Sequence, residues 1–335
     1  MREATVSEEC ALNQRDFYRL VEKGLAEVEL ELQRQASSNV QLIDRIGRYI
    51  HESGGKRIRP AMLLLSARMC GFEGPACYRL GAVVEMVHSA TLVHDDIIDD
   101  AKVRRGHESV NAHWGNEITV LMGDWLYMTS FLLALGERQF RILDILADVT
   151  RKMVEGELIQ LSMNRNPAVT EEQHLDIAMR KTACLFSACT QMGGILGGVA
   201  PEQEEALRLY GLHVGMAFQM VDDVLDFTST ESTLGKPVCS DLKEGKLTLP
   251  MIYLMREGNP EHQELIRAMI RRDGFDGTGG GRILELVREY GTADKVLDKA
   301  ADYARKARGC LDGFPPGEAR DALLAIPDYI VERDR

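Results

Sequence analysis

The sequence is short of the features that mark secreted, membrane-spanning and nucleic-acid-binding proteins. Its seven cysteines are odd in number and include no CxxC pair, and no secretory signal opens the chain, so we expect reduced thiols in a cytoplasmic protein. Lys and Arg number 40 against 52 Asp and Glu, and the resulting net charge of -12 argues against a nucleic-acid binder. The longest uncharged stretch, residues 182–201, carries Thr, Ser, Gln and four glycines, which favours a buried helix over a membrane span.

Alternating runs of β-branched and aromatic residues are also missing, so the sequence predicts no strands. Apolar residues instead recur at three- and four-residue spacings, for example over residues 142–161 and 206–227, which indicates helices. Thr170, before acidic residues, predicts a helix start. The glycine-rich stretch 277–281 lacks a preceding strand and a following Gly-Lys-Ser/Thr, so it favours a turn over a phosphate loop. We therefore predict one all-α domain over residues 1–335.

An acidic cluster closes one of the apolar runs, in "LVHDDIIDDAKVRRG". On a helix Asp95 and Asp99 share one face, and Asp96 lies about 100° round from Asp95. Carboxylates this close repel one another, but they can share divalent cations. Mg²⁺ prefers oxygen ligands and usually takes one or two carboxylates, with water and substrate phosphates completing its shell. Alone, this cluster fits a metal site and a solvated helix end equally well.

A second copy of the spacing favours the metal site. Asp222, Asp223 and Asp226 repeat the pattern in "FQMVDDVLDF", 127 positions later, inside another apolar run. A single helix cannot carry both copies, so two acidic helices can face each other across a cavity and hold metal ions and a polyphosphate between them. Unpaired carboxylates are costly to bury, and two chance clusters of identical spacing are improbable.

Basic residues recur beside the acidic motifs and at breaks between helices. They are Lys56, Arg57, Arg59, Arg104, Arg105, Lys181, Lys236 and Lys246. Guanidinium groups bind phosphate oxygens in bidentate fashion, and lysine supplies a mobile point charge. Each residue alone would be an ordinary surface cation, but together they provide what two phosphate groups need.

Taken in order, these motifs resemble those of the trans-polyprenyl diphosphate synthases, in their long-chain, octaprenyl-like branch. The matching blocks lie between about residues 50 and 255: "GGKRIRP", "LVHDDIIDDAKVRRG", "GDWLY", "EGELIQL", "KTACLF", "GMAFQMVDDVLDF" and "GKPVCSDLKEGKLTLP". Cys239 departs from the family, which usually has a small residue there, and this leaves the shape of its loop open. The resemblance implies a large helical bundle of the isoprenoid synthase type, with a central apolar cavity, and a homodimer without a membrane span.

The resemblance also assigns metal and diphosphate contacts. Mg²⁺, for which Mn²⁺ could substitute, would bind as three ions through Asp95, Asp96, Asp99, Asp222 and Asp226, with Asp223 behind them. The allylic diphosphate would contact Arg104, Lys181 and Lys236. Isopentenyl diphosphate would contact Lys56, Arg59, His88 and Arg105. Lys246 would close over the site.

Thr182 and Gln219 would flank the reacting carbons, where their oxygen dipoles favour positive charge. Two of the assigned residues have ordinary alternatives. His88 lies on an apolar helix and can be a core histidine, and Gln219 can be a hydrogen bonder between helices.

The expected reaction condenses isopentenyl diphosphate repeatedly onto an allylic primer, expected to be farnesyl diphosphate. The residues before the first aspartates bear on product length, because the growing tail would run down beside their helix. Relatives that make short chains carry aromatics at the positions of Ala90 and Thr91, whereas this chain has small residues there, with Val87, Val83 and Met86 further along. Phe131 or Met128 would form the tunnel floor. The expected product is octaprenyl diphosphate, for a quinone side chain.

Other functions fit less of the sequence. A geranylgeranyl (shorter-chain) synthase stays an alternative, although short-chain relatives carry aromatics at the positions of Ala90 and Thr91. A non-catalytic subunit of a heteromeric synthase would typically have lost the acidic motifs, and both are intact here. A class I terpene cyclase normally carries an Asn/Ser/Glu-type second motif, and an HD-type phosphohydrolase leaves the second acidic cluster unexplained.

Overall fold

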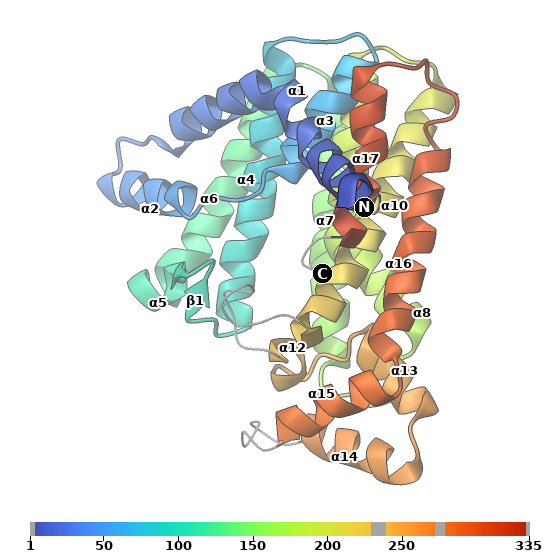
Figure 1. Ribbon diagram of the computed structural model, residues 1–335. Helices are drawn as coiled ribbons and strands as arrows, with labels where there is room; N and C mark the ends of the chain where they lie inside the picture. Colours follow the sequence, from blue (N-terminus) through green and yellow to red (C-terminus); the bar gives the residue numbers. More distant parts are fainter. Residues whose placement is uncertain (1–3, 229–238, 272–278, 333–335) are drawn as a thin grey trace.

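Figure 1 shows the computed structural model of the chain, which describes residues 4–228, 239–271 and 279–332. Helices make up most of this part, so the predicted all-α class is confirmed. The N-terminal half contains α1 (Ala4–Ala36), α2 (Gln41–Glu52), α3 (Ile58–Met69), α4 (Pro75–Ile98), α5 (Val110–Trp114), α6 (Asn116–Gly136) and α7 (Phe140–Met163).

The C-terminal half is also helical. It contains α8 (Glu171–Ala178), the π-helix η1 (Met179–Ala183), α9 (Cys184–Leu196), α10 (Pro201–Thr228), α12 (Ser240–Lys243), α13 (Leu249–Glu257), α14 (Pro260–Arg271), α15 (Gly279–Glu289), α16 (Thr292–Gly309) and α17 (Glu318–Glu332). The predicted start at Thr170 is confirmed, because its hydroxyl and the Gln173 side chain form a capping box at the first turn of α8.

Two short strands correct the prediction that the chain has none. β1 (Val103–Arg104) and β2 (His107–Glu108) pair in antiparallel fashion. Arg105 (φ 52°) and Gly106 (φ 80°) form the turn between them, and both have the positive φ that a two-residue type I′ hairpin turn requires. Strands of two residues are too short to show an alternation in the sequence.

The main core centres on α3, in which residues 58–67 are all buried. α9 packs against α3 and α10, and its residues are almost all buried, which confirms the buried helix predicted within residues 182–201. α10 also packs against α16. Because α4 and α10 run in the same direction, both acidic motifs come to the lower end of the bundle in Figure 1, where α4 leads into β1 and α10 ends near α12.

A smaller core cluster joins α4 to α2 and α6. Met122 and Leu126 of α6 pack there with Ala90 and Val93 of α4. Gly123 permits this close approach, since an added Cβ would overlap the His94 ring. Among the described helices, α6 alone is long and apolar enough to cross a membrane by length and composition, which is weak support for a span because core helices pass the same test.

Candidate active site

The first acidic cluster is divided between two faces of α4. Asp95 is half-buried, and burial raises its pKa to about 6, with Glu157 and Asp99 adding to the rise and Lys181 and Lys246 opposing it. Asp99 accepts a hydrogen bond of 2.8 Å from Lys246 Nζ. Both carboxylates therefore lie close to lysines from elsewhere in the chain, as the predicted shared site requires.

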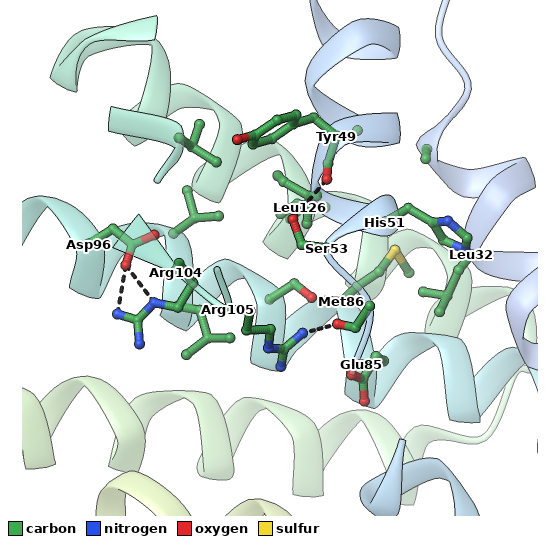
Figure 2. A pocket seen from close by; sticks show the side chains of 18 of the residues that line it. Leu32, Tyr49, His51, Ser53, Glu85, Met86, Asp96, Arg104, Arg105 and Leu126 are labelled. Carbon is green, nitrogen blue, oxygen red and sulfur yellow. Dashed lines mark hydrogen bonds and ion pairs between the residues drawn. The ribbon is translucent and has the colours of Figure 1, made fainter. Parts of the chain in front are cut away.

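Asp96 points to the other side of α4, because it lies about 100° from Asp95 around the helix. It is buried, and its Oδ1 accepts from Arg104 Nε at 2.7 Å and pairs with Arg104 Nη2 at 2.6 Å. Figure 2 shows this pair in the wall of a separate pocket, with the apolar side chains of Met86 and Leu126 nearby. Asp96 is thus paired with Arg104 in this structure, and the predicted contacts of Asp96 with a metal and of Arg104 with the allylic diphosphate stay predictions.

The second acidic cluster divides in a similar way. Asp222 is half-buried on α10, while Asp223 and Asp226 are buried. Asp226 accepts hydrogen bonds from Ser240 Oγ at 3.0 Å and from the backbone nitrogens of Ser240 and Asp241, both at 3.3 Å. Both of its oxygens thus hold the start of α12, and its role as a metal ligand stays a prediction.

Two lysines lie beside the first acidic cluster. Lys246 Nζ donates to Asp99 Oδ1 and, at 2.6 Å, to Glu244 Oε2, and these carboxylates raise the Lys246 pKa against the opposing effect of burial. Lys181 Nζ donates to Gln160 Oε1 at 2.8 Å and forms an ion pair with Glu157. Lys181 lines both the cavity beside Asp95 and the cavity that contains Lys246, so the two cavities meet at this side chain.

Lys181 and Thr182 lie in the π-helix η1, a local widening of the helix that often occurs at functional sites. Gly156 of α7 packs against this segment. A Cβ at that position would lie 2.8 Å from Arg180 Cβ and 3.1 Å from the backbone nitrogen of Lys181, which is too close for an undisturbed structure. Gly156 therefore lets η1 approach α7, where Lys181 finds its partners.

The carboxylates fit a divalent metal only in company with a ligand. Among the described residues no three His, Cys, Asp or Glu side chains lie close enough together to hold an ion by themselves. Mg²⁺ commonly uses one or two carboxylates together with phosphate and water oxygens. Asp95 and Asp99 therefore fit as carboxylate ligands of ions that a diphosphate would complete, and the same role stays a prediction for Asp222. Lys181 and Lys246 supply positive charge beside Asp95 and Asp99.

A cluster of basic side chains is formed by Arg59, His88 and Arg105, the residues predicted to bind isopentenyl diphosphate. Arg57 pairs with Glu29 and Glu85. By contrast, neither Arg59 nor Arg105 forms an ion pair with any other residue that the structure describes. Burial, together with Arg59 and Arg105, lowers the pKa of His88 well below its usual value, so its ring is neutral.

Arg59 is 9% exposed and its guanidinium lies 4.5 Å from the centre of the Phe186 ring, with Nε lacking a hydrogen-bond partner. A buried guanidinium without a counter-ion is costly unless an anion pairs with it. Lys56, predicted to assist, is exposed, and Arg105 donates to the Gly54 carbonyl oxygen. Lys236 and residues 277–278 lie outside the described residues.

The residues predicted to set product length separate into two groups. Thr91 lines the cavity beneath Asp95, together with Tyr127, Met153 and Leu158. Ala90, one position earlier, is turned toward α6 and packs in the smaller core cluster, so its predicted place in the tunnel wall is corrected.

Farther down α4, Val87 is buried in the main core, and Phe131 of α6 is partly buried against that core. Met128 is 60% exposed on the outer side of α6, so the structure does not support it as a tunnel floor. Phe131 stays a prediction for that role.

Four site residues were not predicted: Glu157, Gln160, His174 and Tyr127. Glu157 and Gln160 lie in the "EGELIQL" block. Both contact Lys181, which lies more than twenty positions later in the sequence, 21 positions after Gln160. Tyr127 precedes Phe131 by one helical turn, a spacing that could have indicated it. No local signal marks His174, whose partner Asp223 lies 49 positions later.

Comparisons with known proteins agree with this arrangement. The polyprenyl synthetase family model matches residues 40–279. The octaprenyl diphosphate synthase of Escherichia coli is 37% identical over 329 residues, covering 97% of this chain and 100% of that protein. The all-trans-nonaprenyl-diphosphate synthase (geranyl-diphosphate specific) of Rhodobacter capsulatus is 36% identical over 319 residues, covering 95% and 97%.

A crystal structure of a polyprenyl synthase from Caulobacter crescentus CB15, complexed with calcium and isoprenyl diphosphate, superposes with a TM-score of 0.93. It is 36% identical and the match covers 96% of this chain and 98% of that one. The motifs, the helical fold and these matches lead to one conclusion. The chain belongs to the polyprenyl synthetase family and is a polyprenyl diphosphate synthase, a prenyltransferase of isoprenoid biosynthesis.

Proposed function

We propose that this enzyme makes a long all-trans chain, octaprenyl diphosphate, from isopentenyl diphosphate and a farnesyl diphosphate primer, for a quinone side chain. The observation that carries the length is Thr91. Its small side chain lies in the cavity wall beneath Asp95, where an aromatic ring would block a growing tail. The octaprenyl product of the Escherichia coli relative supports the same length.

Enzymes of this family use a divalent metal, which we propose is Mg²⁺, with three ions per site and Mn²⁺ as a substitute. Asp95, Asp99 and Asp222 would hold it. When bound, it supplies Lewis-acid charge that stabilises the departing diphosphate. Lys181 and Lys246 lie beside these carboxylates and add positive charge that is already in place, which favours charge developing on the diphosphate oxygens.

The other residues would bind and orient the second substrate. Arg59 and Arg105 offer guanidinium groups to the isopentenyl diphosphate, and neutral His88 can donate one hydrogen bond to it. Thr182 Oγ1 donates to Gln219 Oε1 at 2.7 Å, so its lone pairs can face the carbons that become positive. The apolar cavity walls exclude water, which would otherwise capture a cationic intermediate.

We propose a homodimer formed through the outer side of α6 and the neighbouring surface of α7. Leu121 (68%), Leu132 (69%), Phe140 (70%) and Leu158 (61%) are exposed there, and an apolar patch of this kind favours a protein partner. Since Leu158 also lines the cavity beneath Asp95, a second copy of the chain would cover that cavity's open side. Sedimentation that finds only monomer at assay concentrations would contradict this assembly.

The product of the purified chain tests the proposed function. The enzyme would be incubated with labelled isopentenyl diphosphate, Mg²⁺ and either farnesyl or geranyl diphosphate, because one relative is named as specific for the latter. Products would be dephosphorylated and sized by reversed-phase chromatography. We expect octaprenol from farnesyl diphosphate and no product in chelator. Geranylgeraniol as the end product would support a shorter-chain synthase, and no product without a second protein would support a heteromeric subunit.

A further inference from the structure

His174 lies at the start of α8, a position to which the reaction assigns no role so far. It is 8% exposed, and its Nε2 lies 2.7 Å from Asp223 Oδ2 on α10. A backbone hydrogen bond at Leu247 holds the same ring. The imidazole therefore ties α8 to α10 and to the segment just after Lys246.

From Asp223 the contacts continue to the residues proposed to flank the reacting carbons. Gln219 Nε2 donates to Asp223 Oδ1 at 2.9 Å, and Thr182 Oγ1 donates to Gln219 Oε1 at 2.7 Å. His174, Asp223, Gln219 and Thr182 thus form one continuous line of side-chain hydrogen bonds. Three of the four, all but Thr182, border the cavity that contains Lys181 and Lys246.

The direction of each hydrogen bond in this line follows from Asp223. An ionised carboxylate only accepts, so the NH₂ group of Gln219 must face it and the amide oxygen must face Thr182. The Thr182 hydroxyl then has to donate, which leaves its lone pairs for a positive centre. If the carboxamide were rotated by half a turn, the hydroxyl would accept and turn its proton toward that centre.

Burial by itself lowers the pKa of His174. Asp223 and the Leu247 backbone contact outweigh this effect, so the pKa is raised overall. A protonated ring donates from both nitrogens, so it can hold the two acceptors at once. Asp223 is 1% exposed and would be costly as an anion without this partner.

We propose that His174 is a positioning residue: by holding Asp223 it fixes the Gln219 carboxamide, and so presents the oxygen of Thr182 to the reacting carbons. This proposal rests on the proposed function only in placing Thr182 and Gln219 beside those carbons. His174 itself does not touch substrate. The competing role is purely structural, the packing of α8 on α10.

Three variants separate the two roles. His174→Phe keeps the packing volume but removes the donor, and His174→Gln restores a donor near the position of Nε2. His213→Phe is the matched control, because it removes another partly buried imidazole, on α10, next to Tyr303. Initial rates with isopentenyl and farnesyl diphosphates would give kcat and both KM values, and thermal denaturation would report folding.

For His174→Phe we expect kcat to fall about ten- to a hundred-fold, the range for a misplaced reacting group, with both KM values within about two-fold of wild type. His174→Gln should regain most of the loss, and His213→Phe should match wild type. Unchanged kcat in a folded His174→Phe, equal changes in kcat and KM, or no recovery in His174→Gln would overturn the proposal.

Asp223→Asn keeps the test decisive if His174→Phe does not fold. The isosteric change leaves one acceptor oxygen in place of the two that His174 and Gln219 use, so the direction of the line is no longer fixed and kcat should fall as in His174→Phe. The double variant with His174→Leu, which removes the donor with a smaller side chain than Phe, should lose no more than Asp223→Asn alone, because residues of one unit are not additive. Additive losses would overturn the proposal. A wild-type enzyme without activity would refute the proposed function instead.

Discussion

At the scale of single residues, identical motifs contain residues with different tasks. Asp95 and Asp99 lie near lysines, whereas Asp96 is held by Arg104. The sequence predicted that the aspartates matter but assigned Asp95, Asp96 and Asp99 alike. Which carboxylate faces the cavity depends on the rotation of α4 against its neighbours, and a spacing rule gives only the angle between residues on one helix.

Asp95→Asn should abolish most activity without unfolding the protein. The change removes a negative charge where ions and diphosphate must meet, so kcat/KM should fall at least about a hundred-fold. The melting temperature should stay level or rise, because burial opposes that charge. Asp96→Asn serves as the contrast, since it breaks the buried pair with Arg104 and should lower the melting temperature. The opposite pattern of stabilities would refute this division of roles.

The raised pKa of Asp95 predicts that the stability of the folded protein depends on pH when chelator keeps it free of metal. Burial raises that pKa from 3.8 to about 6 in the folded protein, so between these values the folded state binds more protons than the unfolded state. The contribution of Asp95 to stability is therefore fully present below pH 3.8 and is lost as the pH rises to about 6. The melting temperature of Asp95→Asn relative to wild type should rise from pH 4 to pH 6 and then level off. A flat difference would contradict the raised pKa.

Arg59 and Arg105 should govern the isopentenyl substrate. Replacing either by Gln removes one charge-assisted contact worth ~1.5–3 kcal/mol, so KM for isopentenyl diphosphate should rise about ten- to a hundred-fold. KM for the allylic primer should change far less. Arg57→Gln is the matched control, because Arg57 is already paired with Glu29 and Glu85. Equal effects on both substrates would exclude the assignment.

At the scale of elements, the long helices could be predicted from the sequence, whereas the β1–β2 hairpin and the π-helix η1 could not. Apolar spacing extends over many residues, so it predicts long helices such as α7 and α10. The β1–β2 hairpin depends on two positive-φ residues, Arg105 and Gly106, and the π-helix η1 on contacts with α7. Such features reflect tertiary packing, which no local pattern records.

The π-helix offers a test at Gly156. In Gly156→Ala the new Cβ would meet Arg180 and the Lys181 backbone, so α7 and η1 must separate and Lys181 would shift away from Glu157. We expect lower kcat and a lower melting temperature. Gly136→Ala in α6 is the control: nothing lies within 4 Å of its added Cβ, and alanine should stabilise a helix by about 0.5–1 kcal/mol. Normal kinetics in Gly156→Ala would show that this close approach is dispensable.

At the scale of the whole molecule, the bundle places the acidic cluster, the basic cluster and the cavity beneath Asp95 around one end of α4. Asp95, Thr91 and His88 lie on neighbouring turns of that helix, and Arg59 reaches it from α3. The sequence predicted Asp95 from a local spacing, whereas His88 and Arg59 were assigned through the family resemblance. It could not predict that the cavity beneath Asp95 opens toward exposed Leu158, since exposure depends on how α6 and α7 pack.

Product length in Thr91→Phe and Ala90→Phe, measured beside wild type, tests the central claim most directly. Thr91 lines the cavity beneath Asp95, whereas Ala90 packs against α6. We predict octaprenyl diphosphate from wild type, and from Thr91→Phe products no longer than geranylgeranyl diphosphate, with the first condensation still fast. Ala90→Phe should overpack the smaller core cluster and lose stability by about 1–3 kcal/mol. Unchanged product length in Thr91→Phe, or wild-type synthesis that stops at geranylgeranyl diphosphate with ample isopentenyl diphosphate, would contradict the account.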